Sequence, residues 1–169
     1  MGCSGRQPPR TAVLDPKMGE TERVFVGTFQ HTIDDKGRLT LPAKWRDELE
    51  SGIVITRGLD DCLFVFPESK FKTMAEKVVA QGFENQNARD WERFILGNAE
   101  TDEIDKQGRI SISQKLRSAL GLNGEVVVVG LYDRIEVWEP KKHQAMTERV
   151  TAEPSAIAER MRDLMRGAK

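Results

Sequence analysis

The 169-residue sequence contains an internal repeat, and this repeat limits the possible folds more than any other feature. Residues 34–42 (DDKGRLTLP) align with residues 105–113 (DKQGRISIS), 71 positions later. A shared Gly-Arg could arise by chance, but an ordered set of identities indicates a duplication, so one structural unit is expected twice. The identical pairs are Asp34/Asp105, Gly37/Gly108, Arg38/Arg109, Lys44/Lys115, Arg46/Arg117 and Leu49/Leu120.

The similarity continues beyond the motif after a one-residue insertion. Residues 58–66 correspond to residues 130–138, with Gly-Leu, an Asp and then apolar residues at matching places. The duplicated unit is therefore longer than its hairpin, and we predict the same order of elements in both copies.

The first copy predicts a hairpin, a short helix and two further strands. Even spacing of apolar residues indicates the first strand, and in the second strand Leu39 and Leu41 point inward while Arg38 and Thr40 point outward. Pro42 opens the helix at its first turn, where its missing N–H costs nothing. The expected elements are a strand at 24–33, a turn at 34–37, a strand at 38–41, a helix from 42, and strands at 53–55 and 63–66.

The second copy predicts the same elements around residues 105–138. Its helix begins at Ser113 in place of proline, and because serine is a good N-cap we expect the helix to be kept. In both turns the glycine can take a positive φ and the aspartate can accept backbone N–H bonds. The turn-shaping residues are therefore predicted to be Asp34, Gly37, Asp105 and Gly108.

Residues 24–46 strongly resemble the start of MraZ proteins, whose hallmark is Asp-x-Lys-Gly-Arg-x-x-x-Pro. The second motif is also similar to the family's second motif, although Gln107 replaces the lysine and Ser113 the proline. We therefore expect the two copies to contribute unequally. The resemblance extends from about residue 24 to about residue 138, and the complete hallmark consists of Asp34, Lys36, Gly37, Arg38 and Pro42.

The resemblance implies an α+β fold. Two tandem AbrB-like repeats, each a β-hairpin with a short helix, would form an intramolecular pseudo-dimeric small barrel, with amphipathic helices after each repeat. The expected boundaries are an N-terminal extension at 1–22, a first SpoVT-AbrB domain at 24–70, a helical connector at 71–97, a second SpoVT-AbrB domain at 98–141 and a C-terminal helical tail at 142–169.

The resemblance also implies a function. MraZ proteins form ring-shaped homo-oligomers and bind double-stranded DNA at short direct repeats upstream of the operon for cell division and cell-wall synthesis, which includes their own gene. We therefore expect a transcriptional regulator located in the cytoplasm and associated with the nucleoid. Its expected partners are promoter DNA and further copies of the same chain.

Local charge is compatible with DNA binding, although the whole chain carries a net charge of −1. Both motifs are locally positive, and cations that neutralise phosphates give salt-dependent affinity. Arginine also has a planar donor fork that matches guanine O6 and N7, and a two-stranded ribbon fits the major groove. The predicted DNA-binding residues are Lys36, Arg38, Lys44, Arg46, Lys106, Arg109, Lys115 and Arg117.

Other classes of function have weaker support in the sequence. His31 and His143 are the only histidines, and neither lies in a metal or nucleophile pattern, while Cys3 and Cys62 lack metal-ligand spacing. No phosphate-binding or dinucleotide glycine loop occurs, so we expect no enzyme, no cofactor, no metal and no small-molecule substrate. No run of eighteen apolar residues occurs, so no membrane partner is expected.

Two alternatives remain beside the regulator. An AbrB-like antitoxin would use the same hairpin, but such chains typically carry one motif and a disordered tail. A ring-forming scaffold or interaction protein would bind DNA only incidentally.

For the glycine- and proline-containing start of the chain we give equal weight to a disordered extension and to translation from Met18.

Overall fold

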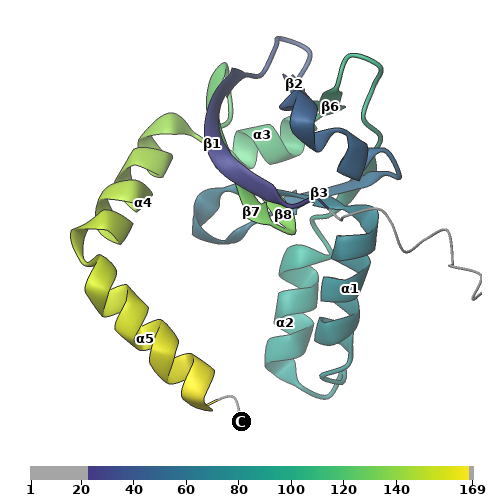
Figure 1. Cartoon of the computed structure of the whole chain (residues 1–169). Helices are drawn as coiled ribbons and strands as arrows, with labels where there is room; N and C mark the ends of the chain where they lie inside the picture. Colours follow the sequence, from purple (N-terminus) through teal and green to yellow (C-terminus); the bar gives the residue numbers. More distant parts are fainter. Residues whose placement is uncertain (1–22, 168–169) are drawn as a thin grey trace, which may run out of the picture.

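The computed structural model describes residues 23–167, so the predictions for the N-terminal extension lie outside the described residues. Two groups of elements follow one another with similar order (Figure 1). The first group is β1 (Phe25–Thr32), β2 (Arg38–Thr40), η1 (Ala43–Trp45), η2 (Asp47–Leu49), β3 (Ile53–Arg57), η3 (Leu59–Asp61), β4 (Leu63–Pro67), α1 (Glu68–Val79) and α2 (Gln86–Ile95). The second group is β5 (Glu100–Asp102), β6 (Arg109–Ser111), α3 (Gln114–Leu120), β7 (Glu125–Tyr132), β8 (Arg134–Trp138), α4 (Pro140–Ala152) and α5 (Pro154–Gly167).

The two copies exchange strands with each other. In the larger sheet, of six strands in the order β1-β7-β8-β4-β3-β5, the first strand of each copy pairs with a strand of the other copy. Thus β1 runs antiparallel to β7, and β5 runs antiparallel to β3. The second strands, β2 and β6, pair only with each other in a separate two-stranded ribbon. Neither copy completes its hydrogen bonding without the other.

The expected closure into a barrel is wrong. Among the described residues the larger sheet has two unpaired edges, β1 and β5, and the ribbon forms a second sheet. The physical reason lies in the turns. After β1, a single bridge between Ile33 and Leu39 joins this end of the larger sheet to β2, and β2 then pairs with β6. Because β2 and β6 satisfy each other, no ladder continues around to join β1 with β5.

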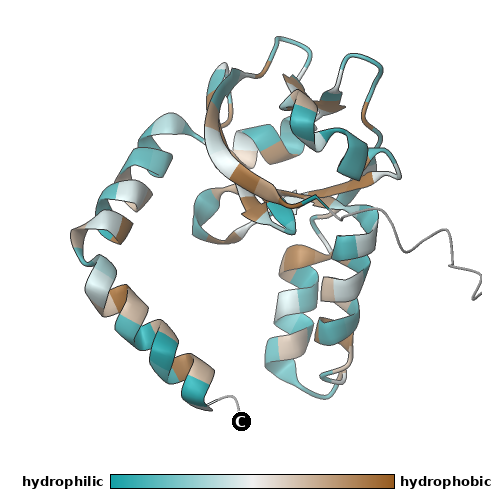
Figure 2. Ribbon diagram, viewed as in Figure 1, coloured by the Kyte–Doolittle hydropathy of each residue, from teal (hydrophilic) through white to brown (hydrophobic). Residues whose placement is uncertain are grey.

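One hydrophobic core lies between the ribbon, the short helices and the larger sheet (Figure 2). Trp45 is buried and packs edge-to-face against Phe25 and Phe29, with ring centroids 5.7 and 5.3 Å apart. Both copies contribute equivalent apolar side chains, so burying one copy's residues requires the other copy. These equivalent residues are Leu39, Leu41 and Leu49 in the first copy and Ile110, Ile112 and Leu120 in the second.

The helix that follows each hairpin differs between the copies. After Pro42 the chain forms two short 3-10 turns, η1 and η2, where the sequence predicted one short helix. After Ser113 a regular helix, α3, forms, and the Ser113 hydroxyl accepts a hydrogen bond from the Leu116 N–H at 3.3 Å. The prediction that the serine N-cap would keep the second helix is confirmed.

The outer helices also differ. α1 and α2 lie antiparallel to each other and project from the larger sheet, contacting β3 and β4 at one end, and Ala88 and Ile95 are the buried residues of α2. α4 and α5 extend along the opposite side of the molecule in Figure 1, and neither contains a buried residue. Among residues 23–167 no helix combines the length and apolar character needed to cross a membrane.

Candidate nucleic-acid interface

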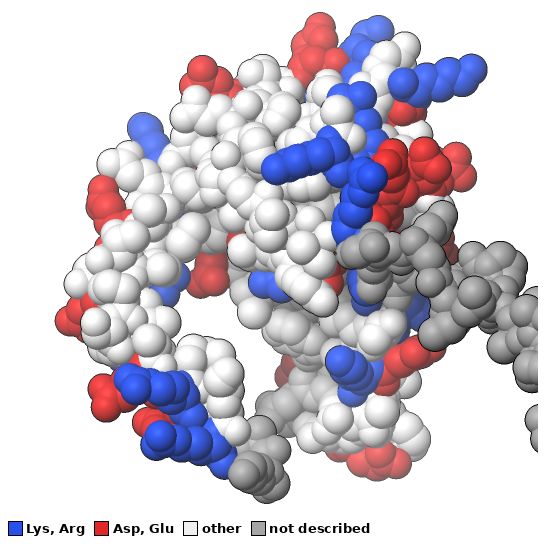
Figure 3. All heavy atoms as spheres, viewed as in Figure 1, with Lys and Arg blue, Asp and Glu red and all other residues white. Residues whose placement is uncertain are grey.

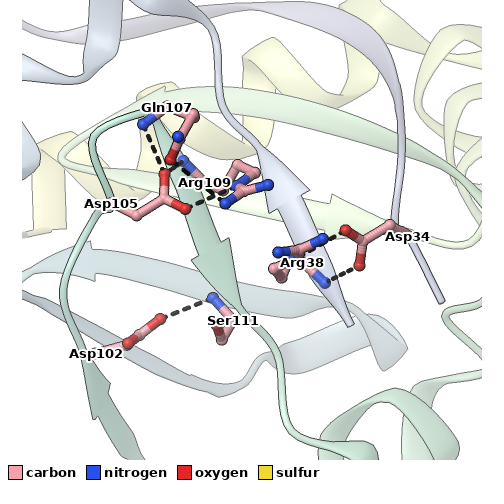
Figure 4. Close-up of polar contacts among 7 residues, drawn as sticks. All are labelled: Asp34, Arg38, Asp102, Asp105, Gln107, Arg109 and Ser111. Carbon is pink, nitrogen blue, oxygen red and sulfur yellow. Dashed lines mark hydrogen bonds and ion pairs between the residues drawn. The ribbon is translucent and has the colours of Figure 1, made fainter. Parts of the chain in front are cut away.

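The ribbon of β2 and β6 carries one arginine from each copy on its outer face. Arg38 lies opposite Ser111 and Thr40 lies opposite Arg109, so the two arginines occupy diagonal positions. Leu39 and Ile110 alternate with them and are completely buried beneath the ribbon. Because successive side chains of a strand point to opposite faces, burial of these two apolar residues directs both arginines outward (Figure 4).

The same turn precedes each arginine. In the first copy, Oδ1 of Asp34 accepts the N–H of Lys36 at 3.0 Å and the N–H of Arg38 at 2.9 Å. Gly37 donates its N–H to the Asp34 carbonyl at 3.0 Å and has a φ of 79°. This φ lies in the left-handed region that glycine adopts without steric cost. The aspartate therefore closes the turn that places the following arginine.

The second turn reproduces these contacts. Oδ1 of Asp105 accepts the N–H groups of Gln107 and Arg109, each at 2.9 Å, and Gly108 has a φ of 76°. In both copies the hydrogen bond from the arginine N–H is the main cause that lowers the aspartate pKa below its usual value. Both carboxylates are therefore ionised at neutral pH.

Each aspartate also fixes the side chain of its arginine. Nε of Arg38 donates to Oδ2 of Asp34 at 2.7 Å, and Nε of Arg109 donates to Oδ2 of Asp105 at the same distance. Both arginine side chains remain about one-third exposed, at 31% and 29%. Because the ion pairs use only Nε, both terminal nitrogens of Arg38 remain available to a ligand, while Nη2 of Arg109 also donates to Oε1 of Gln107 at 3.4 Å and Nη1 remains available.

The four predicted lysines occupy different surroundings. Lys36 and Lys106 lie exposed in the two turns, and Lys115 lies exposed on α3. Lys44 instead folds over the Phe29 ring, with its Nζ 4.6 Å from the ring centroid and 3.5 Å from the Val26 carbonyl. Figure 3 shows Lys and Arg side chains over the upper part of the molecule, where Figure 1 places the two turns, interspersed there with Asp and Glu, and a second group of Lys and Arg on α5 at the lower left.

Arg46 and Arg117 differ from the other predicted arginines in their hydrogen-bond partners. Both are half-buried, and both donate to a backbone carbonyl of their own copy. Nε and Nη2 of Arg46 donate to the Leu41 carbonyl at 3.2 and 3.1 Å, and Nε of Arg117 donates to the Ile112 carbonyl at 3.0 Å. The structure thus separates two arginines that are bound to backbone from two that lie on the outer face of the ribbon.

The sequence reasoning missed two acidic residues that support the second copy. Oδ2 of Asp102 accepts the N–H of Ser111 at 2.7 Å, and Oε1 of Glu100 accepts the Ser113 hydroxyl at 2.9 Å. The repeat alignment offered a signal, because Asp102 falls on His31 and Glu100 on Phe29, so the first copy has no acid at either place. These contacts tie β5 to the ribbon in the second copy alone.

The remaining candidates for metal or thiol chemistry are the His, Cys, Asp and Glu side chains. No group of three or more His, Cys, Asp or Glu side chains between residues 23 and 167 could hold a metal ion. Burial raises the pKa of the Cys62 thiol well above its usual value, and its Sγ donates to the Leu59 carbonyl at 3.0 Å. A buried thiol with a raised pKa carries little reactive thiolate.

Comparison with known proteins gives a consistent result. A family model described as "MraZ protein, putative antitoxin-like" matches the chain twice, over residues 24–94 and 95–165. Three relatives carry the name "Transcriptional regulator MraZ". The protein from Saccharopolyspora erythraea is 44% identical over 121 residues, which cover 72% of this chain and 85% of the relative. The protein from Thermomicrobium roseum is 39% identical over 142 residues (84% and 100%), and that from Moorella thermoacetica is 41% identical over 140 residues (83% and 98%).

Proposed function

The chain belongs to the MraZ family, and from this membership we propose that it regulates transcription by binding double-stranded DNA with the β2–β6 ribbon. The observation that carries the proposal is the placement of Arg38 and Arg109 on one outer face, each ion-paired through Nε and each with a side chain about one-third exposed. The matched relatives are named as transcriptional regulators, so the function proposed is not that of an enzyme.

The ribbon suits the major groove of B-DNA, which admits a two-stranded β-structure. The terminal nitrogens of an arginine match O6 and N7 of guanine as a bidentate pair, and such a pair discriminates between bases. Asp34 and Asp105 fix Nε of the two arginines, so less side-chain freedom is lost when the fork meets a base. The ribbon thereby presents two preorganised readers, one from each copy.

Phosphate contacts would supply the remaining affinity. Lys36, Lys106 and Lys115 are exposed around the turns and α3, and Lys44 is exposed beside β1. Each lysine that neutralises a phosphate releases counterions, which makes binding weaker as salt increases. Since the whole chain has a net charge of −1, this attraction depends on the local excess of cations in the two motifs.

We further propose that the chain acts as a ring homo-oligomer on direct repeats upstream of its own cell-division and cell-wall operon. One ribbon makes few contacts, and several ribbons in one assembly would raise the avidity for repeated sites without a new kind of contact. The uncovered apolar side chains of α5 support self-association, since Leu164 and Met165 are 68% and 66% exposed. Location in the cytoplasm and association with the nucleoid follow from this proposal, and no membrane or small-molecule substrate is involved.

The test compares the wild-type chain with a variant that carries both Arg38→Ala and Arg109→Ala. A mobility-shift assay uses the region upstream of the protein's own operon, with a shuffled fragment of equal length as competitor. We expect specific binding to be lost while a sizing column shows the oligomer unchanged. Binding of the repeats by the double variant as tightly as by wild type would show that the ribbon is not the reader.

A charge-matched control separates reading from bulk electrostatics. Arg93 on α2 and Arg149 on α4 are exposed, and their joint replacement by alanine removes the same charge away from the ribbon. We expect this control to retain specific binding at equal salt. Equal losses in the two double variants would mean that net charge, and not the ribbon, determines the affinity.

A further inference from the structure

The glycine in each hairpin turn is buried, although its neighbours in the turn are exposed. Lys36 and Lys106 lie in solvent, whereas Gly37 and Gly108 are covered. The cover comes from the other copy in both cases. A Cβ atom on Gly37 would lie 2.9 Å from Nε of Arg117, and one on Gly108 would collide with the guanidinium of Arg46. Each turn is thus capped by an arginine of the other copy, which lies 80 residues from Gly37 in one case and 62 residues from Gly108 in the other.

A connected set of hydrogen bonds holds each arginine in this position. The N–H of Leu41 donates to the Gly108 carbonyl at 2.9 Å, and the Leu41 carbonyl accepts two bonds from Arg46, which covers Gly108. The hydrogen bonds around Gly37 have the same arrangement. The N–H of Ile112 donates to the Gly37 carbonyl at 2.9 Å, and the Ile112 carbonyl accepts from Arg117, which covers Gly37.

We propose that Arg46 and Arg117 are positioning residues, each of which sets the reading arginine of the opposite copy. Gly108 directly precedes Arg109, and Gly37 directly precedes Arg38, so an arginine that fixes the glycine also fixes the start of the reading strand. Arg46 therefore acts on Arg109, and Arg117 acts on Arg38. This inference rests on the proposed function, and it replaces the direct DNA contacts predicted for these two residues.

Their surroundings favour this role over contact with DNA. Both guanidinium groups lie against a turn glycine of the opposite copy and donate to a carbonyl of their own copy, so displacing one toward a phosphate would break these bonds and uncover the glycine. The identity of arginine in both copies also has a physical reason here. Each guanidinium carries several donors and extends over the glycine while it donates to a carbonyl, and the single ammonium of lysine cannot do both.

The inference predicts a crossed pattern in DNA affinity. Arg46→Lys and Arg117→Lys keep the charge but lose the planar group, and each is combined with Arg38→Ala and with Arg109→Ala. We expect Arg46→Lys to weaken binding on the order of fivefold in the wild type and in Arg38→Ala, and to have no further effect in Arg109→Ala. Arg117→Lys should show the reverse, with no further effect in Arg38→Ala.

A direct contact with phosphate gives a different result. Lysine would largely keep such a contact, so each Lys variant would change affinity little and to the same extent in both backgrounds. Either that outcome or a same-copy pattern would overturn the inference. Arg46→Gln and Arg117→Gln provide a second pair of variants, because a glutamine amide can still donate to the Leu41 or Ile112 carbonyl without covering the glycine. The same crossed pattern is expected for them.

Hydrogen exchange followed by mass spectrometry tests the capping without DNA. In Arg46→Lys we expect faster exchange in a peptide containing residues 105–111 and unchanged exchange in one containing residues 34–40, and the opposite in Arg117→Lys. Unchanged exchange in both peptides would overturn the inference. If Arg38→Ala and Arg109→Ala bind DNA as well as wild type, the proposed function fails, while the exchange pattern still decides whether the arginines cap the opposite turns.

Discussion

The turn of the first repeat has Lys36 at the position where the turn of the second has Gln107, and this exchange changes how the reading arginine is held. Oε1 of Gln107 accepts a bond from Nη2 of Arg109 at 3.4 Å, in addition to the ion pair with Asp105. Arg38 is held through Nε by Asp34 alone. The second reader therefore has one terminal nitrogen already occupied within the protein.

The contacts around the two turns also restrain the second repeat more than the first. In the second repeat, Asp102 and Glu100 bond to the ribbon and to the start of α3, and α3 is a regular helix with a serine cap. In the first repeat, 3-10 turns follow Pro42 and no acid lies at the equivalent places. The comparison indicates that Arg38 of the first copy, with Lys36 nearby, is the more mobile reading arginine, and that Arg109 of the second copy is more restrained.

The largest effect is expected from removing the reading arginines one at a time. Arg38→Ala should weaken specific DNA binding more than Arg109→Ala, since Arg38 keeps both terminal nitrogens free and has Lys36 beside it. A bidentate arginine–guanine pair contributes about 1–3 kcal/mol, so we expect losses of about 10-fold to 100-fold for Arg38→Ala and severalfold for Arg109→Ala. Fluorescence anisotropy on the operator at fixed salt measures both.

The reciprocal exchange sharpens this comparison. Gln107→Lys should release Nη2 of Arg109 and add a cation, whereas Lys36→Gln should make the first turn resemble the second. If the turn residue causes the asymmetry, these two variants bring the effects of Arg38→Ala and Arg109→Ala closer together. An unchanged ratio would assign the asymmetry to the supporting acids instead.

A smaller effect is expected from filling the turn glycines. Gly37→Ala and Gly108→Ala place a side chain at positive φ, which costs about 1–2 kcal/mol, and also push against the covering arginine. The Gly37 variant should be less stable, because its Cβ would also lie 2.8 Å from the Ile112 carbonyl, which belongs to backbone and cannot turn aside. Chemical denaturation of each variant measures the free energy of unfolding.

Gly121 supplies the matched control for these glycines. It caps α3 with a φ of 69°, but a Cβ at this position would meet no atom within 4 Å. Gly121→Ala therefore carries the conformational cost alone. If Gly37→Ala and Gly108→Ala cost no more than Gly121→Ala, the covering arginines do not restrain the turns.

The sequence predicted the elements of each copy well because these depend on local patterns. Even spacing identified the strands, Gly37 and Gly108 identified the turns, and Ser113 identified the start of α3. The two family-model matches confirm the duplication. Each of these features is encoded within about ten residues, where periodicity and turn chemistry are informative.

The arrangement of the two copies was not predictable in the same way. Pairing of β1 with β7 and of β2 with β6 joins residues that are about 70 to 100 positions apart, and no local pattern specifies such a partner. This is also why the barrel prediction failed. Arg46 and Arg117 likewise look like the other cations of a basic motif, because the sequence does not reveal that a turn of the opposite copy lies over them.

The cap of α3 should have an effect of about 1 kcal/mol. Ser113→Ala removes both the bond to the Leu116 N–H and the bond to Glu100, and the loss of an N-cap serine typically costs about 1 kcal/mol. Pro42→Ala at the equivalent position should cost less, because Pro42 makes no side-chain cap bond to η1. Thermal unfolding of the two variants tests whether the second repeat depends more on its cap than the first. Equal losses would remove this part of the asymmetry.

The smallest effect is expected from the two turn aspartates and depends on pH. Hydrogen bonds from the arginine N–H groups lower the pKa of Asp34 and of Asp105 in the folded chain. A carboxyl group with a lowered folded pKa stabilises the fold fully above its unfolded pKa of about 3.9, and this contribution is lost as the pH falls through the lower, folded value. Acid unfolding followed by circular dichroism should therefore begin below about pH 4 for these groups.

Asn at either position keeps an acceptor for the turn but removes the titration, so each variant should show a weaker dependence of stability on pH. Asp34→Asn should also disturb its arginine more than Asp105→Asn, because Gln107 still contacts Arg109 when the carboxylate is gone. If both Asn variants retain the wild-type pH dependence, the carboxylates of the two aspartates do not contribute to acid stability.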